Sequence, residues 1–383
     1  MTSPRTAWVP RSVEAMGQSG SVTADPTAAI VGTGDGPVLA IDGNSILHRA
    51  FHSQAGTGLR GADGRPLWAI RGLVGQLVEA VDRVAPQQVV IGFDDAASSL
   101  RRERWTTYKA QRAPKPETLV SQLALAVEML RDLGMPVVVP TGLEADDVLA
   151  AVAARAADTG GRAVLMTSDR DAFALISPST SVLRMLSGGV EGSPLLTPDR
   201  LHLMTGIHPA QYLDYAALRG DASDNLPGVR GVGPKTAARL LAALGTARAA
   251  FDDLDAGGTL VSDAVGTTIA RRLAEPGSRA AWELNCLVMA PQPGVELPAP
   301  GGWPLAVDPV RQACRVLQMP ATTSRALRVL AHHDAPVDVD PMAWSRPAAA
   351  EVTRWSDGGR MRFPALKARQ PEKEPAQLSL FGI

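Results

Sequence analysis

The stretch Gly142-Leu-Glu-Ala-Asp-Asp-Val-Leu149 places three carboxylates, Glu144, Asp146 and Asp147, within four residues. It follows Met135-Pro-Val-Val-Val-Pro140, a β-branched run bounded by prolines that predicts a short buried strand, and it precedes an alanine-rich run typical of a helix. The acids therefore stand where a strand passes into the N-terminus of a helix. One or two acids are ordinary there, but three repel one another unless a cation holds them together. Taken alone, the stretch leaves helix capping and metal binding about equally open.

Three more apolar runs end in aspartate. They are Val38–Asp42, Val89–Asp94 and Ala163–Asp169, with Asp171 two residues beyond the last. The stretches between them, such as Ala69–Val84 and Leu119–Leu133, predict helices. Strands that alternate with helices predict an α/β fold with a parallel sheet covered by helices on both faces. Because parallel strands share one carboxyl edge, acids at four strand ends would form a negative cup there, which suits hard cations such as Mg²⁺ or Mn²⁺.

Composition bounds the function only loosely. The 383 residues are 45% hydrophobic, which supports a substantial core, and no apolar run is long enough to span a membrane. The two cysteines, Cys286 and Cys314, lack metal-type spacing, which favours a reducing compartment and a cytoplasmic location. The net charge is −1, so any binding of nucleic acid must come from local basic patches.

The most basic stretch of the chain follows Asp94 and contains two aromatic residues, Trp105 and Tyr108. Its cations are Arg101, Arg102, Arg104, Lys109, Arg112 and Lys115, against the single acid Glu103. A solvated charged loop is the usual interpretation of such a run. Its place directly after an aspartate of the sheet edge favours a segment that grips phosphates, with aromatic rings able to stack on bases.

A second motif runs from Leu218 to Leu241. It contains Asp221 and Asp224, three residues apart, and then Gly231-Val-Gly-Pro-Lys235 before a predicted helix, Thr236–Leu241. Glycines before a helix N-terminus leave backbone N–H groups available to a phosphate, although Gly-x-Gly alone also fits a simple turn. Its position after the aspartate pair favours the phosphate site.

These motifs together resemble the 5′-nuclease (flap endonuclease) family, especially the amino-terminal 5′→3′ exonuclease domain of bacterial DNA polymerase I, here as a stand-alone protein. The resemblance covers about residues 37–320, and the order and spacing of its motifs agree throughout. The matching stretches are Ile41-Asp-Gly-Asn-Ser45, Arg49-Ala-Phe-His52, Phe93-Asp94, Arg101, Tyr108-Lys-Ala-Gln-Arg112, Gly142-Leu-Glu-Ala-Asp-Asp147, Thr167-Ser-Asp-Arg-Asp171, Gly220-Asp-Ala-Ser-Asp-Asn-Leu-Pro-Gly-Val229 and Gly231-Val-Gly-Pro-Lys-Thr-Ala237.

The resemblance implies that the parallel sheet is Rossmann-like or PIN-like, and it implies a role for particular residues. The implied metal ligands, for two or more Mg²⁺ or Mn²⁺ ions, are Asp42, Asp94, Glu144, Asp146, Asp147, Asp169, Asp171, Asp221 and Asp224. The implied catalytic cations are Lys109, Arg112 and Arg101. The implied DNA contacts are Arg49, Arg102, Arg104, Tyr108, Lys115 and, in a helix–three-turn–helix element that often holds K⁺, Gly231, Gly233, Lys235 and Thr236. The chain departs from the family at Arg170, where lysine is usual, and at Leu100, where an aromatic residue is common.

The predicted domain organisation has four parts. Residues 1–36 form a disordered leader and 37–205 the catalytic domain, with a helical arch at about 95–125. Residues 206–335 form the helix–three-turn–helix and C-terminal helical region, and 336–383 a proline-rich tail. The tail contains Gln377-Leu-Ser-Leu-Phe381, which resembles the sliding-clamp-binding motif of bacterial replication proteins. Gln377, Leu378, Leu380 and Phe381 are its expected clamp contacts, although chance apolar residues in a frayed tail would look similar.

The sequence therefore predicts a monomeric, metal-dependent 5′→3′ exonuclease and flap endonuclease, a hydrolase acting on nicked, branched or flapped DNA, with use in primer and flap removal. A first alternative is a clamp-tethered, structure-specific DNA-binding protein with little catalysis, against which the complete set of nine acids argues. A second is a PIN-type ribonuclease, but such domains lack a segment like residues 220–241.

Overall fold

The computed structural model describes residues 36–299 and 303–333, so most of the predicted leader and all of the tail 336–383 lie outside the described residues. Six strands form one sheet. They are β1 (Val38–Asp42), β2 (Gln88–Gly92), β3 (Val137–Val138), β4 (Ala163–Thr167), β5 (Thr180–Arg184) and β6 (Leu195–Leu196). Within the described residues no helix is both long and apolar enough to cross a membrane.

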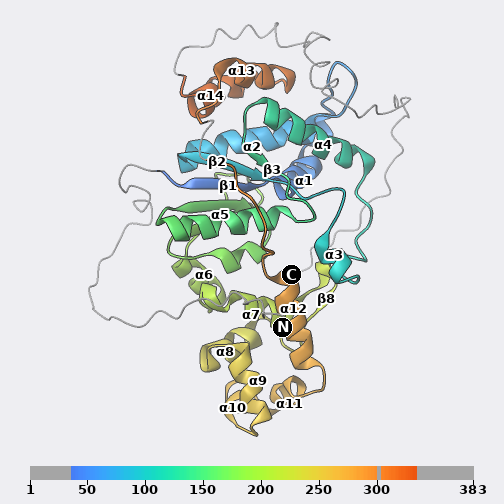
Figure 1. The fold of residues 1–383 in the computed structure, drawn as a ribbon, viewed down its shortest axis with the longest axis vertical. Coiled ribbons are helices and arrows are strands. Elements are labelled where there is room, and N and C mark those ends of the chain that lie inside the picture. Colours follow the sequence, from blue (N-terminus) through green and yellow to red (C-terminus); the bar gives the residue numbers. More distant parts are fainter. Residues whose placement is uncertain (1–35, 300–302, 334–383) are drawn as a thin grey trace, which may run out of the picture. The chain divides into compact units, whose positions relative to one another are not determined.

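The strand order is β3-β2-β1-β4-β5-β6, with every pair parallel except β5 and β6 (Figure 1). This confirms the predicted parallel α/β sheet. Ile41 lies opposite both Ile91 and Met166, so the three central strands end level and the acids that follow them leave the same edge. β5 and β6 were not predicted. The predicted strand 135–140 pairs only over β3, because it lies at the sheet edge and is bounded by Pro136 and Pro140, which cannot donate to a ladder.

Alternating side chains of the strands feed two cores, one on each face of the sheet. Leu39 and Ile41 enter the core formed with α1 (Gly43–Gln54), α2 (Trp68–Val84) and α4 (Glu117–Asp132). Ala40 enters the other, formed with α5 (Ala145–Thr159) and α7 (Tyr212–Arg219). Strands buried on both faces read as continuous apolar runs, which is why these strands were recognisable from sequence.

The segment predicted as a helical arch is only partly helical. It contains α3 (Leu100–Arg104) and then residues 105–116, here called the basic loop, which has turns but no helix before α4 begins. Pro114 and Pro116 oppose a continuous helix there, since proline lacks an N–H group and restricts the residue before it.

Further helices follow the sheet in sequence. They are α6 (Pro198–Thr205), α8 (Pro234–Leu244), α9 (Ala247–Asp255), α10 (Leu260–Val265), α11 (Thr267–Leu273) and α12 (Ser278–Met289). Between α7 and α8 lies a two-stranded antiparallel ribbon of β7 (Gly220–Asp221) and β8 (Leu226–Pro227). Leu240 of α8 and Phe251 of α9 belong to the same core as α5, so these helices pack as a continuation of that face of the sheet.

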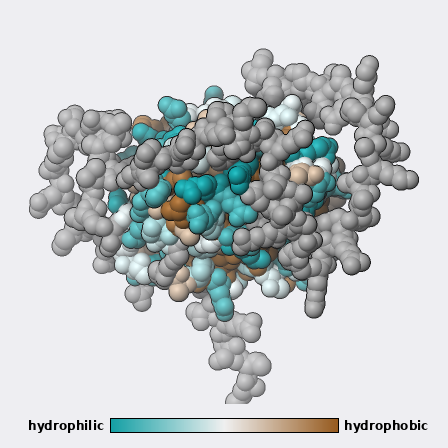
Figure 2. Space-filling model, turned by 90° about the horizontal axis from the view of Figure 1, so that it is seen from above, coloured by the Kyte–Doolittle hydropathy of each residue, from teal (hydrophilic) through white to brown (hydrophobic). Residues whose placement is uncertain are grey.

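The last two described helices, α13 (Val307–Val316) and α14 (Pro320–Ala331), differ from the predicted organisation. Leu317 and Leu327 are fully buried in the core that contains α2, so this pair covers that face of the six-stranded sheet and does not extend the helical region after residue 206. Arg325 and Arg328 also pair with Asp82 of α2. Where grey atoms do not hide it, the face over these helices is mainly hydrophilic in Figure 2.

Candidate functional site

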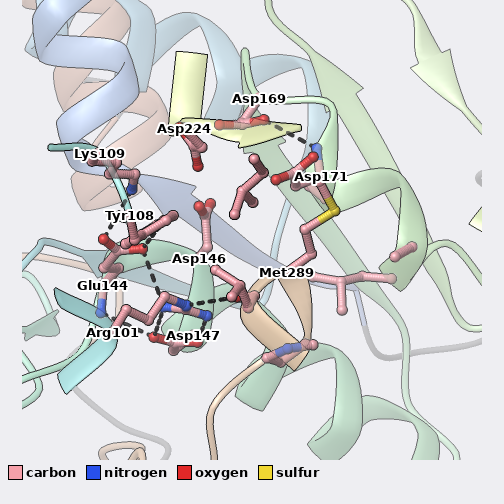
Figure 3. A pocket seen from close by; sticks show the side chains of 16 residues that line it. Arg101, Tyr108, Lys109, Glu144, Asp146, Asp147, Asp169, Asp171, Asp224 and Met289 are labelled. Atoms are coloured by element: carbon pink, nitrogen blue, oxygen red, sulfur yellow. Dashed lines mark hydrogen bonds and ion pairs between the residues drawn. The ribbon is translucent and has the colours of Figure 1, made fainter. Parts of the chain in front are cut away.

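Acidic side chains from separate elements meet in one pocket beyond the carboxyl edge of the sheet. Asp146 comes from the first turn of α5, Asp169 and Asp171 follow β4, and Asp224 belongs to the turn between β7 and β8 (Figure 3). Asp42 ends β1 and faces Asp146 closely enough to shift its pKa. The structure thus brings together acids that are up to 182 positions apart, from Asp42 to Asp224.

Several of these acids have raised pKa values, because they are buried close to one another. Burial, followed by the charges of Asp42 and Asp169, raises the pKa of Asp146 well above its ordinary value. Burial raises the pKa of Asp42 to about 7, helped by Asp94 and opposed by a hydrogen bond from the Ser45 N–H. The pKa of Asp171 is likewise raised to about 7 by burial and by neighbouring aspartates. Such shifts mean that added negative charge is costly here unless a cation offsets it.

The donor set fits a hard divalent cation in charge and atom type. The Oδ1 atom of Asp146 is buried and has no hydrogen-bond partner, which is unusual for a carboxylate oxygen and leaves it available as a ligand. In the described part of the chain, however, no three His, Cys, Asp or Glu side chains converge closely enough to hold an ion as they stand. The acids therefore fit a cation chemically, but side chains must turn to coordinate one.

Hydrogen bonds fix two of the acids. The Asp42 carboxylate accepts from the Ser45 N–H and from the Thr167 hydroxyl, both at 2.8 Å. Asp94 accepts from the Asn44 side-chain amide at 2.6 Å and from the Ala145 N–H at 3.0 Å. The sequence did not indicate the roles of Thr167 and Asn44, although both lie within matching motifs. Both side chains are neutral, so they do not stand out in the pattern of charged residues.

Asp95 was also missed. Hydrogen bonds from the Ser98 hydroxyl and from the Gly142 and Ala97 N–H groups lower its pKa to about 2. Through the Gly142 bond, at 2.8 Å, Asp95 ties the end of β2 to the turn that carries the acids of α5. Its only sequence signal was its place next to Asp94.

Asp147 and Arg101 correct two sequence expectations. Asp147 was predicted as a metal ligand, but both its oxygens are used: Arg101 donates to each, at 2.7 and 2.8 Å, and the N–H groups of Glu144 and Gln292 donate to them as well. The other N–H groups of Arg101, predicted as catalytic, bind Glu144 and the carbonyls of Val288 and Ala290. Both side chains are buried, and the pair joins α3, α5 and the end of α12 at the wall of the pocket, where the oxygens of Asp147 already have their partners (Figure 3).

Glu144 is held by cations. Lys109 Nζ donates to it at 2.9 Å, and the Tyr108 hydroxyl and Arg101 donate at 3.1 Å. Burial alone would raise the pKa of Glu144, but Lys109 and Arg101 hold it below its ordinary value. At the turn between β7 and β8, Arg112 donates to Asp224. Asp221 accepts from the N–H and hydroxyl of Ser223, so its carboxylate shapes the turn that carries Asp224.

Tyr108 differs from the expectation that it contacts DNA. Its ring is 5% exposed and packs against Leu226 and Val288, so it is not free to stack on a base. Lys109 Nζ lies 4.6 Å from the centre of the same ring. Tyr108 thus supports Lys109 and Glu144 from the wall of the acid pocket.

The remaining predicted DNA contacts lie outside the acid pocket. Arg102 and Arg104 are exposed on α3, Arg49 is half-buried on α1, and Lys115 Nζ lies 3.9 Å from Asp94. Beside them, burial and then the charges of Lys115, His52 and Arg112 lower the pKa of His48 to about 4, which indicates a positive potential at this side of the site.

Residues 231–236, here called the hairpin, form a second, separate region after the β7–β8 ribbon. Gly231 has a φ of +81°, which favours glycine, and Gly233 is the N-cap of α8, with Lys235 exposed and Thr236 half-buried in its first turn. None of these residues lines the acid pocket. Gln377, Leu378, Leu380 and Phe381 lie outside the described residues.

Comparison with known proteins gives two family models that match consecutive parts of the chain. The model described as 5′-3′ exonuclease, N-terminal resolvase-like domain, matches residues 37–202, and that described as 5′-3′ exonuclease, C-terminal SAM fold, matches 207–281. Together they cover well over half of the 383 residues.

Curated relatives include two DNA polymerases I. That of Mycobacterium tuberculosis is 36% identical over 233 residues, which is 61% of this chain and 26% of the relative. The thermostable enzyme of Thermus thermophilus is 41% identical over 220 residues, which is 57% of this chain and 25% of the relative. The chain thus spans about a quarter of the length of these relatives. Among solved structures, the T5 5′-exonuclease with bound zinc has a TM-score of 0.54 at 18% identity, covering 77% of this chain and 99% of the other, which supports the fold.

Proposed function

We propose, because this chain belongs to the 5′-3′ exonuclease family, that it is a metal-dependent 5′→3′ exonuclease and structure-specific flap endonuclease. It hydrolyses phosphodiesters of nicked, branched or 5′-flapped DNA. The observation that carries this proposal is the crowded acid pocket, in which the buried Oδ1 of Asp146 has no partner among neighbours of like charge. Crowded buried acids lower the free energy of unfolding, so such a site is expected mainly where function requires it.

The proposed metal ligands are acids that line this pocket or lie beside it. Asp42, Asp94, Asp146, Asp169 and Asp171 form one group, and Glu144, Asp221 and Asp224 join it once their present partners turn away. Mg²⁺ or Mn²⁺ suits these oxygen donors, and when bound it supplies an activated water and charge stabilisation for the leaving oxygen. Asp147 is not included, because Arg101 and two N–H groups already occupy its oxygens.

The chain's own cations have two roles in this proposal. Lys109 and Arg112 lie at the rim of the pocket and offset the charge that builds on the scissile phosphate. Arg49, Arg102, Arg104 and Lys115 bind backbone phosphates of the strand that enters the pocket. The hairpin from Gly231 to Thr236 binds the phosphates of the duplex without reading sequence, through a helix N-terminus and the Lys235 ammonium, with K⁺ as an additional ligand.

The remaining proposals concern context. The protein acts as a cytoplasmic monomer that removes RNA primers and displaced flaps during replication and repair. Its segment Gln377–Phe381 binds the sliding clamp, which raises its effective concentration at nicks.

A clamp-tethered DNA-binding protein with little catalysis is the alternative. The observation that favours it is the pairing of Glu144 with Lys109 and of Asp224 with Arg112, since a pocket filled by its own cations is not preformed for metal.

Cleavage of a 5′-labelled flap decides between the two. With Mg²⁺ or Mn²⁺ the native protein should release products near the junction, and Asp146→Asn should lower the rate by more than about 100-fold, since even outer partners of metal ligands cost about 10- to 100-fold. Asp82→Asn, a remote acid beside Arg325, is the matched control and should cut at the native rate. Flap binding without cleavage in either metal would establish the alternative.

A further inference from the structure

The basic loop is docked on the turn between β7 and β8. The backbone N–H of Lys109 donates to the Asp224 carbonyl at 3.0 Å, and Arg112 Nε donates to the Ser223 carbonyl at 3.2 Å. Two neutral amides complete the contact: Gln111 Nε2 donates to the Ala222 carbonyl at 2.6 Å, and Asn225 Nδ2 donates to the Thr107 carbonyl at 2.9 Å. One amide belongs to the loop and the other to the turn, so together they fix loop residues 107 and 111, on either side of Lys109, to the turn.

This docking places two cations of the loop on two acids of the pocket. Lys109 Nζ binds Glu144 at the N-terminus of α5, and Arg112 binds Asp224 on the turn. Figure 3 shows Lys109 and Glu144 on one side of Asp146, with Asp224 nearby. The loop therefore bridges two elements that the proposed metal site also uses.

The contact constrains the loop backbone. Lys109 has a φ of +54° and Asn225 a φ of +59°, a region that most side chains avoid but asparagine tolerates. A lysine adopts this conformation only where its surroundings hold it. The hydrogen bonds of the Lys109 backbone and side chain supply that hold, and the amides of Gln111 and Asn225 flank it.

Glu144 and Asp224 cannot serve the loop and a divalent cation with the same oxygens. We propose that Gln111 and Asn225 are positioning residues that keep the basic loop on these two acids, and that the loop and a divalent cation compete for them. Binding of the cation then releases Lys109 and Arg112 toward a phosphate. This inference rests on the proposed cation site but not on nuclease activity.

Trypsin tests the docking, because it cleaves after the two cations concerned, at Lys109–Ala110 and Arg112–Ala113. In chelator, the native loop should be cleaved slowly at these bonds, and Mg²⁺ should raise the rate by about tenfold, the equivalent of about 1.4 kcal/mol. Gln111→Ala and Asn225→Gly should be cleaved at the fast rate without Mg²⁺. Glycine keeps the positive φ of residue 225 and removes only the amide. Gln87→Ala, at another exposed glutamine, is the matched control and should behave as the native protein.

Calorimetry with Mg²⁺ alone provides the second readout and separates this inference from the proposed function. Both variants should bind Mg²⁺ several-fold more tightly than the native protein, because the competing loop is weakened. If Mg²⁺ binds but changes neither cleavage nor its affinity in the variants, the inference is overturned while the metal site stands. If Mg²⁺ does not bind at all, both the competition and the proposed metal site are overturned. Potassium chloride of equal ionic strength should leave cleavage slow, and fast cleavage there would overturn the competition in favour of general screening.

Discussion

At the scale of single residues, the site depends on which charges are paired. Asp146 and Asp147 are neighbours in sequence, yet one has a buried oxygen without a partner and the other accepts four hydrogen bonds. The sequence alone could not show which of the two acids has a free oxygen. The partner of Asp147, Arg101, is 46 positions away, and Arg101 is itself held by two carbonyls at the end of α12. Adjacent acids at a helix start point in different directions, and only the tertiary structure decides which one meets a cation.

We expect a large loss of stability when the Arg101 side chain is removed from its pair with Asp147. Arg101→Ala should lower the free energy of unfolding by about 3–5 kcal/mol, because it leaves Asp147 buried without its cation. Arg102→Ala, at the exposed neighbour, should change it by less than about 0.5 kcal/mol. Urea denaturation measures both, and a loss below about 1 kcal/mol for Arg101→Ala would contradict the assigned structural role.

The raised pKa of Asp171 predicts a particular dependence of stability on pH. Because its folded pKa of about 7 lies above the ordinary value of 3.8, the folded state binds more protons between these values, and stability from this group falls as pH rises through that window. In chelator, Asp171→Asn should therefore match the native protein near pH 4 and melt at a higher temperature near pH 8. A difference of about 2–4 °C, or roughly 1–2 kcal/mol, is expected.

Added Mg²⁺ should reverse that order at pH 8, since only the native protein keeps the full set of acids. Thermal melting in chelator and in Mg²⁺ checks both statements. A melting difference that stays constant from pH 4 to pH 8 would show that Asp171 is not in a crowded acidic site.

At the scale of elements, the sequence predicted the strands and helices that have a clear local pattern of apolar residues. β1, β2 and β4 were recognisable as buried apolar runs, and the aspartates that end or follow them, Asp42, Asp94 and Asp169, lie close enough at one edge for the charges of the other two to raise the pKa of Asp42. The strand predicted at 135–140 pairs over only the two residues of β3, because prolines bound it. Prolines also explain why the predicted arch is not helical over the basic loop. β5 and β6 were missed because no candidate site residue lies in them, and the pairing of β5 with β4 and of β6 with β5 depends on the tertiary structure.

Close packing beside the β7–β8 ribbon leaves no room for a methyl group at Gly228, so we expect an alanine there to lower stability. A Cβ on Gly228 would lie 2.0 Å from the Arg219 carbonyl oxygen, a backbone atom that cannot move without shifting Gly220. Gly228→Ala should therefore cost about 1–3 kcal/mol of stability and displace Asp221 and Asp224. Flap cleavage should fall at temperatures where the variant is still folded.

Gly56→Ala is the matched control, because a Cβ there meets nothing within 4 Å. It should leave melting temperature and cleavage unchanged to within experimental error. Native-like melting and cleavage in Gly228→Ala would mean that the ribbon does not fix the acids of its turn.

At the scale of the whole molecule, parts distant in sequence complete the site. α13 and α14 cover the face of α2, about 240 positions before them, and the C-terminal end of α12 supplies carbonyls to Arg101 beside the acid pocket. The four-part division drawn from sequence could not anticipate this, because amphipathic helices show which face is buried but not against what. The elements that follow residue 206 therefore serve the catalytic sheet as well as the hairpin.

The separation of the acid pocket from the hairpin predicts that binding and chemistry are lost independently. Lys235 lies outside the pocket on an exposed first turn of α8, so Lys235→Ala should weaken DNA binding several-fold and reduce the salt slope of binding by about 1. The kcat at saturating flap should stay native, whereas Asp146→Asn should lower kcat and leave DNA affinity nearly intact. Fluorescence anisotropy at several salt concentrations and single-turnover cleavage measure the two effects. If Lys235→Ala lowered kcat at saturating DNA, the hairpin would have to act on the scissile phosphate, and the two regions could not be treated as separate.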